Sequence, residues 1–235
     1  MLETRIQPAS THTSRTLTAI LRIYLTLILP VLLVLASVRL LMTPAFLYFE
    51  YTRPGFPEDI YGFTVTDRLR YAPYAIDYLL NGEDITYLSS LRFPDGRSLF
   101  NVRELQHMRD VKVVTQLAYL VAVIAGLIGL FSIFWLGKDP STRRDLYAGL
   151  FHGSLLTLGM IGAIVLAAIV NWDFFFTGFH TLFFESGTWR FAYSDTLIRL
   201  FPEQFWFDAA LLIGGMTTLS ALVILLVTWR WKTRI

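Results

Sequence analysis

The sequence predicts an all-α membrane protein: four transmembrane helices, a small extracytoplasmic α+β cap and an aromatic interfacial segment. Of its 235 residues, 54% are hydrophobic and only 16% are charged, whereas a soluble domain carries about 25% charged residues. Four apolar stretches account for the excess, and the last three are long enough for the roughly 20 helical residues that cross a hydrocarbon core. These stretches are 23–38, 113–137, 146–172 and 209–229.

The apolar stretches and their flanking residues set the expected boundaries. The predicted transmembrane helices occupy 16–42, 102–137, 146–172 and 208–229. The remaining segments are a cytoplasmic tail (1–15), an extracytoplasmic cap (43–101), a cytoplasmic turn (138–145), an extracytoplasmic interfacial segment (173–207) and a second cytoplasmic tail (230–235).

Basic residues near the ends of the apolar stretches predict the orientation, because Lys and Arg are retained on the cytoplasmic side. They gather before the first stretch, between the second and third, and after the fourth. With four spans these positions share one side, so both termini of this multi-pass protein are expected in the cytoplasm. The residues are Arg5, Arg15, Arg22, Lys138, Arg143, Arg144, Arg230, Lys232 and Arg234.

Two patterns predict the mixed cap. Residues 66–82 (TDRLRYAPYAIDYLLNG) place apolar side chains at helical spacing and end in Asn-Gly, which favours a helix stop. Residues 86–100 (TYLSSLRFPDGRSLF) contain a Pro-Asp-Gly turn between two short runs with large apolar residues, a pattern typical of a β-hairpin.

Asn101 and Glu104 form an expected capping box, so the second long helix begins at Val102, before the membrane. On this helix Arg103, His107 and Asp110 share one face. Asp110 or Glu104 is therefore expected to accept a proton from one ring nitrogen of His107 and to fix its tautomer.

His180 lies in a segment crowded with aromatic residues, 172–193. Aromatic side chains at this density are typical of a membrane interface. We expect this segment to lie in or dip into the outer leaflet. The side chains expected to face lipid or an acyl chain are Phe179, Phe183, Phe184 and Trp189.

His107 and His180 are both expected on the outward side, and imidazole exchanges protons near neutral pH. The pair therefore invites an acid/base interpretation, with a structural or pH-sensing role as the alternative. The chain has no cysteine, which excludes thiol catalysis, and it lacks the common metal, nucleotide and serine-hydrolase motifs. No metal, cofactor or nucleic acid is expected, since the spacing of the two histidines gives no support to a metal site.

Three blocks resemble the bacterial integral membrane family typified by lipoprotein intramolecular transacylase. They are GFTVTDRLRYAPYAIDYLLNG, FNVRELQHMRDV and FHTLFFESGTWRFAYSDTLIRLFPEQFW. The resemblance implies transfer of the sn-2 acyl chain of a diacylated lipoprotein to the α-amino group of its own N-terminal cysteine, at the extracytoplasmic face of a bacterial cytoplasmic membrane. The implied partners are that lipoprotein and membrane lipid.

The family's two catalytic histidines fall on His107 and His180. We expect His180 to act as base and His107 to donate a proton or steady the intermediate, although the roles can be exchanged. Residues expected to support them are Glu104, Asp110, Arg103, Arg39, Asp67 and Arg68. The alternatives are a non-catalytic membrane interaction or sensor protein, and another outer-leaflet lipid acyltransferase or hydrolase.

Overall fold

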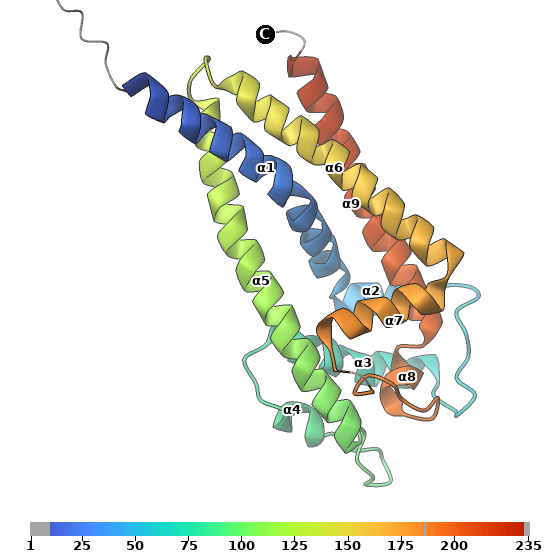
Figure 1. Cartoon of the computed structure of the whole chain (residues 1–235). Helices are drawn as coiled ribbons and strands as arrows, with labels where there is room; N and C mark the ends of the chain where they lie inside the picture. Colours follow the sequence, from blue (N-terminus) through green and yellow to red (C-terminus); the bar gives the residue numbers. More distant parts are fainter. Residues whose placement is uncertain (1–9, 186, 233–235) are drawn as a thin grey trace, which may run out of the picture. The chain divides into compact units, whose positions relative to one another are not determined.

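The computed structural model describes residues 10–185 and 187–232 (Figure 1). Over these residues the chain is helical with connecting loops. The helices, in chain order, are α1 (Ser10–Leu41), α2 (Pro44–Thr52), α3 (Val65–Leu80), α4 (Thr86–Ser89), α5 (Val102–Gly137), α6 (Arg143–Val170), α7 (Trp172–Phe183), α8 (Thr196–Leu200) and α9 (Glu203–Lys232).

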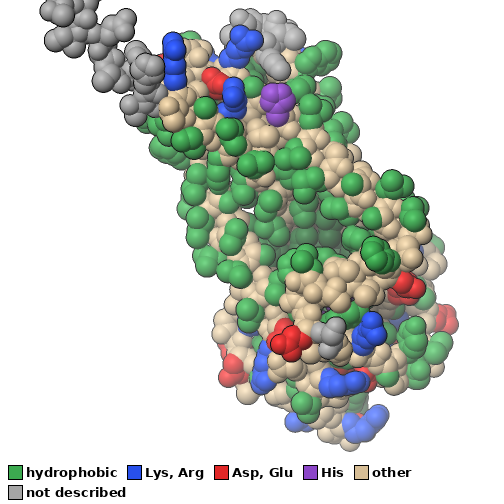
Figure 2. Space-filling view, in the orientation of Figure 1, with side chains coloured by type: hydrophobic (Ala, Val, Ile, Leu, Met, Phe, Trp, Pro, Cys, Tyr) green, Lys and Arg blue, Asp and Glu red, His purple; other side chains and the backbone are tan. Residues whose placement is uncertain are grey.

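Within the described residues, four helices are long and apolar enough to cross a membrane: α1, α5, α6 and α9. Their most apolar windows have mean hydropathies of 2.3 to 2.5. Large apolar side chains such as Leu27, Leu130 and Ile169 are more than 60% exposed on them. Figure 2 shows such side chains covering much of the long helices, with charged side chains toward their ends. This surface suits lipid and not water.

Three of the four long helices begin earlier than predicted, and their last residues differ from the predicted ones by one to three positions. Residues 10–15, expected in a tail, belong to α1, and the rest of that tail lies outside the described residues. The turn before α6 is shorter than predicted, because this helix begins at Arg143. Helix α9 begins at Glu203, inside the expected interfacial segment. In α5, 36 residues extend over about 54 Å, so its polar beginning can stand outside a hydrocarbon core of about 30 Å.

The chain divides into two compact units, and the first comprises the described parts of 1–34, 122–162 and 217–235. Here α1 packs against α5 and α6. The Tyr24 hydroxyl donates to the carbonyl of Ala125 at 2.6 Å, and Arg22 pairs with Asp145 at 2.9 Å. Gly149 lets the α1 backbone approach closely, since a Cβ there would lie 3.0 Å from the carbonyl oxygen of Arg22.

The second unit comprises 35–121 and 163–216 and holds both predicted catalytic histidines. Its core joins α2, α3 and α8 to the first turns of α5 and α9. The Tyr51 hydroxyl donates to the carbonyl of Leu200 at 2.8 Å and secures α8 inside this core. The buried apolar residues are Leu47, Tyr51, Tyr71, Ala72, Ala75, Ile76, Tyr78, Leu88, Leu99, Phe100, Met108, Leu197, Leu200, Phe201 and Phe205.

The predicted α+β cap is wrong, because the described cap residues form helices and loops with no strand. The Pro-Asp-Gly turn does form, and Phe93 N–H donates to the carbonyl of Arg97 at 2.9 Å. Pairing stops at one isolated bridge between Arg92 and Ser98. The first half of the expected hairpin is instead helix α4, because Asp84 accepts the N–H of Thr86 and starts a helical turn.

Replacement of Gly149 by valine should destabilise the first unit. The new side chain meets the α1 backbone, and overpacking of this kind costs about 1–3 kcal/mol. Gly159→Val is the matched control, because the same helix leaves open space at Gly159. Thermal unfolding in detergent should show a clearly lower Tm for Gly149→Val than for Gly159→Val. Equal Tm values would contradict the close approach of α1 and α6.

Candidate active site

His107 and His180 lie next to each other in the second unit. His107 is on the second turn of α5 and His180 is near the end of α7. Their ring centroids are 6.4 Å apart and the ring planes differ by 24°. At this separation one small group, such as an ester, can contact both rings. The structure therefore brings together the two residues that the sequence singled out.

Aromatic side chains surround both imidazoles. Phe184 and Phe191 present their edges to His107 at centroid distances of 5.2 and 5.4 Å. His180 lies against Phe176 at 4.1 Å and Trp189 at 4.7 Å. Such rings exclude water and offer no charge to stabilise an imidazolium. The surroundings therefore favour neutral imidazoles.

A backbone hydrogen bond defines the tautomer of His180. Its Nδ1 lies 2.8 Å from the carbonyl oxygen of Phe176, and because that oxygen can only accept, Nδ1 carries the proton. In the neutral ring the lone pair is then on Nε2. Burial lowers the pKa of His180 below its ordinary value, and the hydrogen bond to Phe176 partly opposes this shift. His180 therefore favours the neutral form, whose basic nitrogen is Nε2.

His107 is held differently. Its Nδ1 is buried and has no hydrogen-bond partner among the described residues. A buried lone pair without a donor costs less than a buried N–H without an acceptor. This favours the tautomer with the proton on Nε2. The two rings then differ in function, with a basic Nε2 on His180 and an N–H donor on His107.

The capping box at the start of α5 is confirmed. Asn101 Oδ1 accepts the N–H of Glu104 at 3.0 Å, and Glu104 Oε2 accepts the N–H of Asn101 at 2.7 Å. Glu104 forms no hydrogen bond with His107, however. Its other oxygen accepts the N–H of Leu197 at 2.7 Å, and the side chain is only 1% exposed. The expected orienting role is therefore replaced by a structural one, which ties α5 to α8.

Asp195 adds further bonds between the start of α5 and the segment before α8. Its carboxylate accepts from Asn101 Nδ2 at 3.1 Å and from the N–H of Ala192 at 2.9 Å. It also pairs with Arg103 at 3.4 Å. Sequence reasoning missed Asp195, because nothing in the local pattern indicates a partner more than ninety residues away. These bonds fix the end of the segment that carries Trp189 and Phe191.

The other expected supporting residues have partners away from the pair. Asp110 accepts from Gln106, and Arg39 donates to the carbonyl of Met42. Asp67 is the acid of a capping box that starts α3, and hydrogen bonds to Thr64 lower its pKa. Arg68 is buried, donates to the carbonyls of Pro57 and Arg199, and has a pKa lowered by burial. Among the described residues none of these four forms a hydrogen bond or ion pair with either imidazole.

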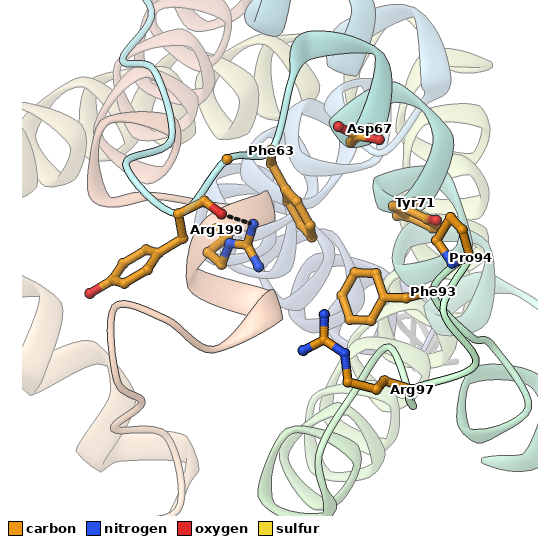
Figure 3. A pocket seen from close by; sticks show the side chains of 9 residues that line it. Phe63, Asp67, Tyr71, Phe93, Pro94, Arg97 and Arg199 are labelled. Carbon is orange, nitrogen blue, oxygen red and sulfur yellow. Dashed lines mark hydrogen bonds between the residues drawn. The ribbon is translucent and has the colours of Figure 1, made fainter.

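Figure 3 shows a cavity of about 250 Å³ that Asp67 helps to line. Arg199 lies over the ring of Phe63, with its guanidinium carbon 3.6 Å from the ring centroid, and donates to the carbonyl of Tyr61. Arg97 lies over Phe93 at 5.5 Å. Neither histidine lines this cavity. Asp67 therefore lies beside this cavity in the cap and not beside the histidine pair.

The aromatic side chains expected to face lipid divide into two groups. Phe179 and Phe183 are exposed on α7, as a lipid contact requires. Phe184 is partly buried against His107. Trp189 is buried against His180 and is only 8% exposed, so in this structure it faces the site and not the surroundings.

The long apolar helices define a multi-pass helical membrane protein, and its second unit holds two imidazoles enclosed by aromatic rings. The chain matches the family described as "Lipoprotein intramolecular transacylase Lit" over residues 23–206. It belongs to this family of membrane acyltransferases.

Structures of the membrane-integral lipoprotein intramolecular transacylase Lit from Bacillus cereus share the fold. One, with a histidine replaced by alanine, has a TM-score of 0.73 at 19% identity and covers 96% of this chain and 97% of that one. Another has a TM-score of 0.69 at 22% identity, with coverages of 95% and 97%. An uncharacterised protein from Aquifex aeolicus is 28% identical over 207 residues, which are 88% of this chain and 92% of that protein.

Replacement of Glu104 by glutamine should lower the free energy of unfolding by about 2 kcal/mol, the usual loss for a hydrogen bond to a charged group. An amide places an NH₂ group opposite one of the two main-chain N–H donors. Asp110→Asn is the control, because the partner of that side chain is the exposed Gln106. Denaturant unfolding in detergent measures both. Equal free energies of unfolding for the two variants would show that the Glu104 carboxylate does not stabilise the fold.

Acidification should destabilise the wild type more than His180→Phe. The pKa of His180 in the folded protein is below its ordinary value of 6.5, so the unfolded chain takes up the proton more readily. The contribution of His180 to stability is complete above that value and is lost as the pH falls below it. Tm measured between about pH 7 and about pH 5 should fall more steeply in the wild type. Parallel curves would show that His180 is not harder to protonate when folded.

Proposed function

We propose that this protein moves the sn-2 acyl chain of a lipoprotein's diacylglyceryl group to the α-amino group of the same lipoprotein's N-terminal cysteine. The observation that carries the proposal is the histidine pair, with ring centroids 6.4 Å apart and complementary protonation favoured on the two rings. The reaction needs a base that takes a proton from the amine and returns it to the departing oxygen, and a hydrogen-bond donor at that oxygen, and this pair supplies both.

His180 serves as the base in this proposal. An α-amino group has a pKa near 8, so a useful fraction is neutral and attacks the ester carbonyl without a covalent enzyme intermediate. The new C–N bond leaves a positively charged nitrogen. Nε2 of His180, whose lone pair is free because Nδ1 is bonded to Phe176, takes the surplus proton.

His107 serves as a hydrogen-bond donor. As the bond between the carbonyl carbon and the sn-2 oxygen breaks, the departing oxygen takes the proton that Nε2 of His180 has gained from the amine, and the Nε2–H of His107 donates a hydrogen bond to that oxygen. The products are an amide and a free sn-2 hydroxyl. Both imidazoles are then neutral again, so the starting state is restored. Both reacting groups belong to one molecule, which makes their alignment a large part of the acceleration.

The location of the site suits a lipid substrate. Exposed Phe179 and Phe183 on α7 provide apolar contacts for acyl chains beside His180. We place this face on the extracytoplasmic side of a bacterial cytoplasmic membrane, with both termini in the cytoplasm. The support is the clustering of Lys and Arg at the opposite ends of the long helices.

Replacement of either His107 or His180 by alanine should abolish the N-acyl, monoacylglyceryl cysteine product, because loss of a general base or of a hydrogen-bond donor at the reacting oxygen costs about 10²- to 10⁴-fold in rate. His152→Ala is the control, since this histidine lies on α6 in the first unit. Mass spectrometry of the N-terminus of a lipoprotein from cells expressing each variant measures the product.

A diacylglyceryl cysteine left unaltered by the wild type would contradict the proposed activity. Release of fatty acid from phospholipid with no change in the lipoprotein would identify a lipid hydrolase instead. Product formation that survives in His107→Ala or His180→Ala would show that the pair is structural.

A further inference from the structure

Trp189 carries a buried hydrogen-bond donor that has no acceptor. The side chain is 8% exposed, and Nε1 has no hydrogen-bond partner among the described residues. Buried donors nearly always find acceptors, because an unpaired one costs free energy. A phenylalanine would supply an aromatic ring here without that cost. Packing alone therefore does not account for the indole N–H.

The unpaired donor lies at the histidine site. The Trp189 ring is 4.7 Å from His180, at an interplanar angle of 32°. Among the described residues, three buried side-chain polar atoms lack a partner, and the other two belong to His107 and Glu50. Two of the three thus belong to rings that lie next to His180, those of Trp189 and His107. Unpaired polar atoms gathered in this way are typical of a place where a substrate supplies the missing partner.

The proposed reaction needs one group that neither histidine provides. As the amine attacks, the carbonyl oxygen becomes negatively charged and requires a hydrogen-bond donor. The arginines that the sequence analysis listed as supporting residues, Arg39, Arg68 and Arg103, are bonded to other groups. Trp189 Nε1 is uncommitted, and its apolar surroundings strengthen any bond it makes to a charged oxygen.

We infer that the indole N–H of Trp189 donates a hydrogen bond to the oxyanion of the tetrahedral intermediate. The inference rests on the proposed transacylase function and adds a catalytic residue to it. The substrate ester enters between the enclosing rings, and its carbonyl oxygen becomes the acceptor that Nε1 lacks. No proton leaves Trp189, because an indole donates a hydrogen bond and does not act as an acid at neutral pH.

Two replacements of Trp189 separate the N–H from the ring. Trp189→Phe removes the donor and part of the ring. A tryptophan analogue in which sulfur replaces the indole N–H keeps the bicyclic shape. Trp172→Phe is the matched control, since Trp172 packs against Phe207 and not against either histidine. Each full-length protein is assayed in detergent with a synthetic peptide bearing a diacylglyceryl cysteine, together with His107→Ala and a measurement of Tm.

Both replacements should lower kcat by about 100-fold or more, as for loss of an oxyanion donor, with KM changed little and Tm not lowered. Trp172→Phe should retain wild-type kcat. If the protein with the sulfur analogue retains full kcat, the inference is overturned, even if Trp189→Phe is inactive or unstable. Catalysis would then depend on the shape of the bicyclic ring and not on its N–H. A wild type that does not convert the peptide would contradict the transacylase function itself. If the wild type converts the peptide and His107→Ala does not, the function stands, and the Trp189 variants then test the oxyanion inference alone.

Discussion

The buried carboxylate of Glu104 joins the two chain segments that build the histidine site. Its oxygens accept main-chain N–H groups from Asn101 and Leu197, which lie on segments distant in the sequence. A carboxylate removed from water must be bonded in this way, because unpaired burial of a charge is very costly. The bond holds the first turn of α5 against α8, and Asp195 extends the tie to the segment that ends there. The rings that enclose the imidazoles depend on this arrangement.

The proposed chemistry uses neutral rings, and neither histidine has an acidic hydrogen-bond partner among the described residues. In a serine hydrolase an acid steadies the imidazolium that forms when a hydroxyl is activated. Here the proposed nucleophile is an amine that is already partly neutral, so the demand on the base is smaller. The main-chain carbonyl of Phe176 orients His180 without adding a charge. This explains why burial in an aromatic enclosure is compatible with acid/base function.

Local patterns predicted much of this structure. Long apolar stretches identified the four membrane-spanning helices, and the Asn101 and Glu104 pair identified the true start of α5. The hairpin does not form because residues 86–89 fold into helix α4, after Asp84 accepts the N–H of Thr86, and too few residues then remain to pair across the turn. Turn residues define a reversal of the chain, but they do not guarantee that the flanking residues form strands.

The sequence was sufficient to select His107 and His180 as candidate site residues, but it did not predict which side chains surround them. Helical phase predicted Asp110 and Glu104 as partners of His107. Asp110 instead accepts from Gln106 on the same helix, and Glu104 accepts from Leu197, a residue distant in the sequence. The contacts of Phe191 and Trp189 with the imidazoles join segments that no short-range pattern relates.

The central claim is that His107 and His180 act as one unit on a single ester. The most direct test is the transacylation rate of the double variant His107→Ala/His180→Ala compared with those of the two single variants. Residues that act together are strongly non-additive. The account predicts that the double variant is no slower than the slower single variant. A rate equal to the product of the two separate losses would show that the histidines act independently and would contradict the account.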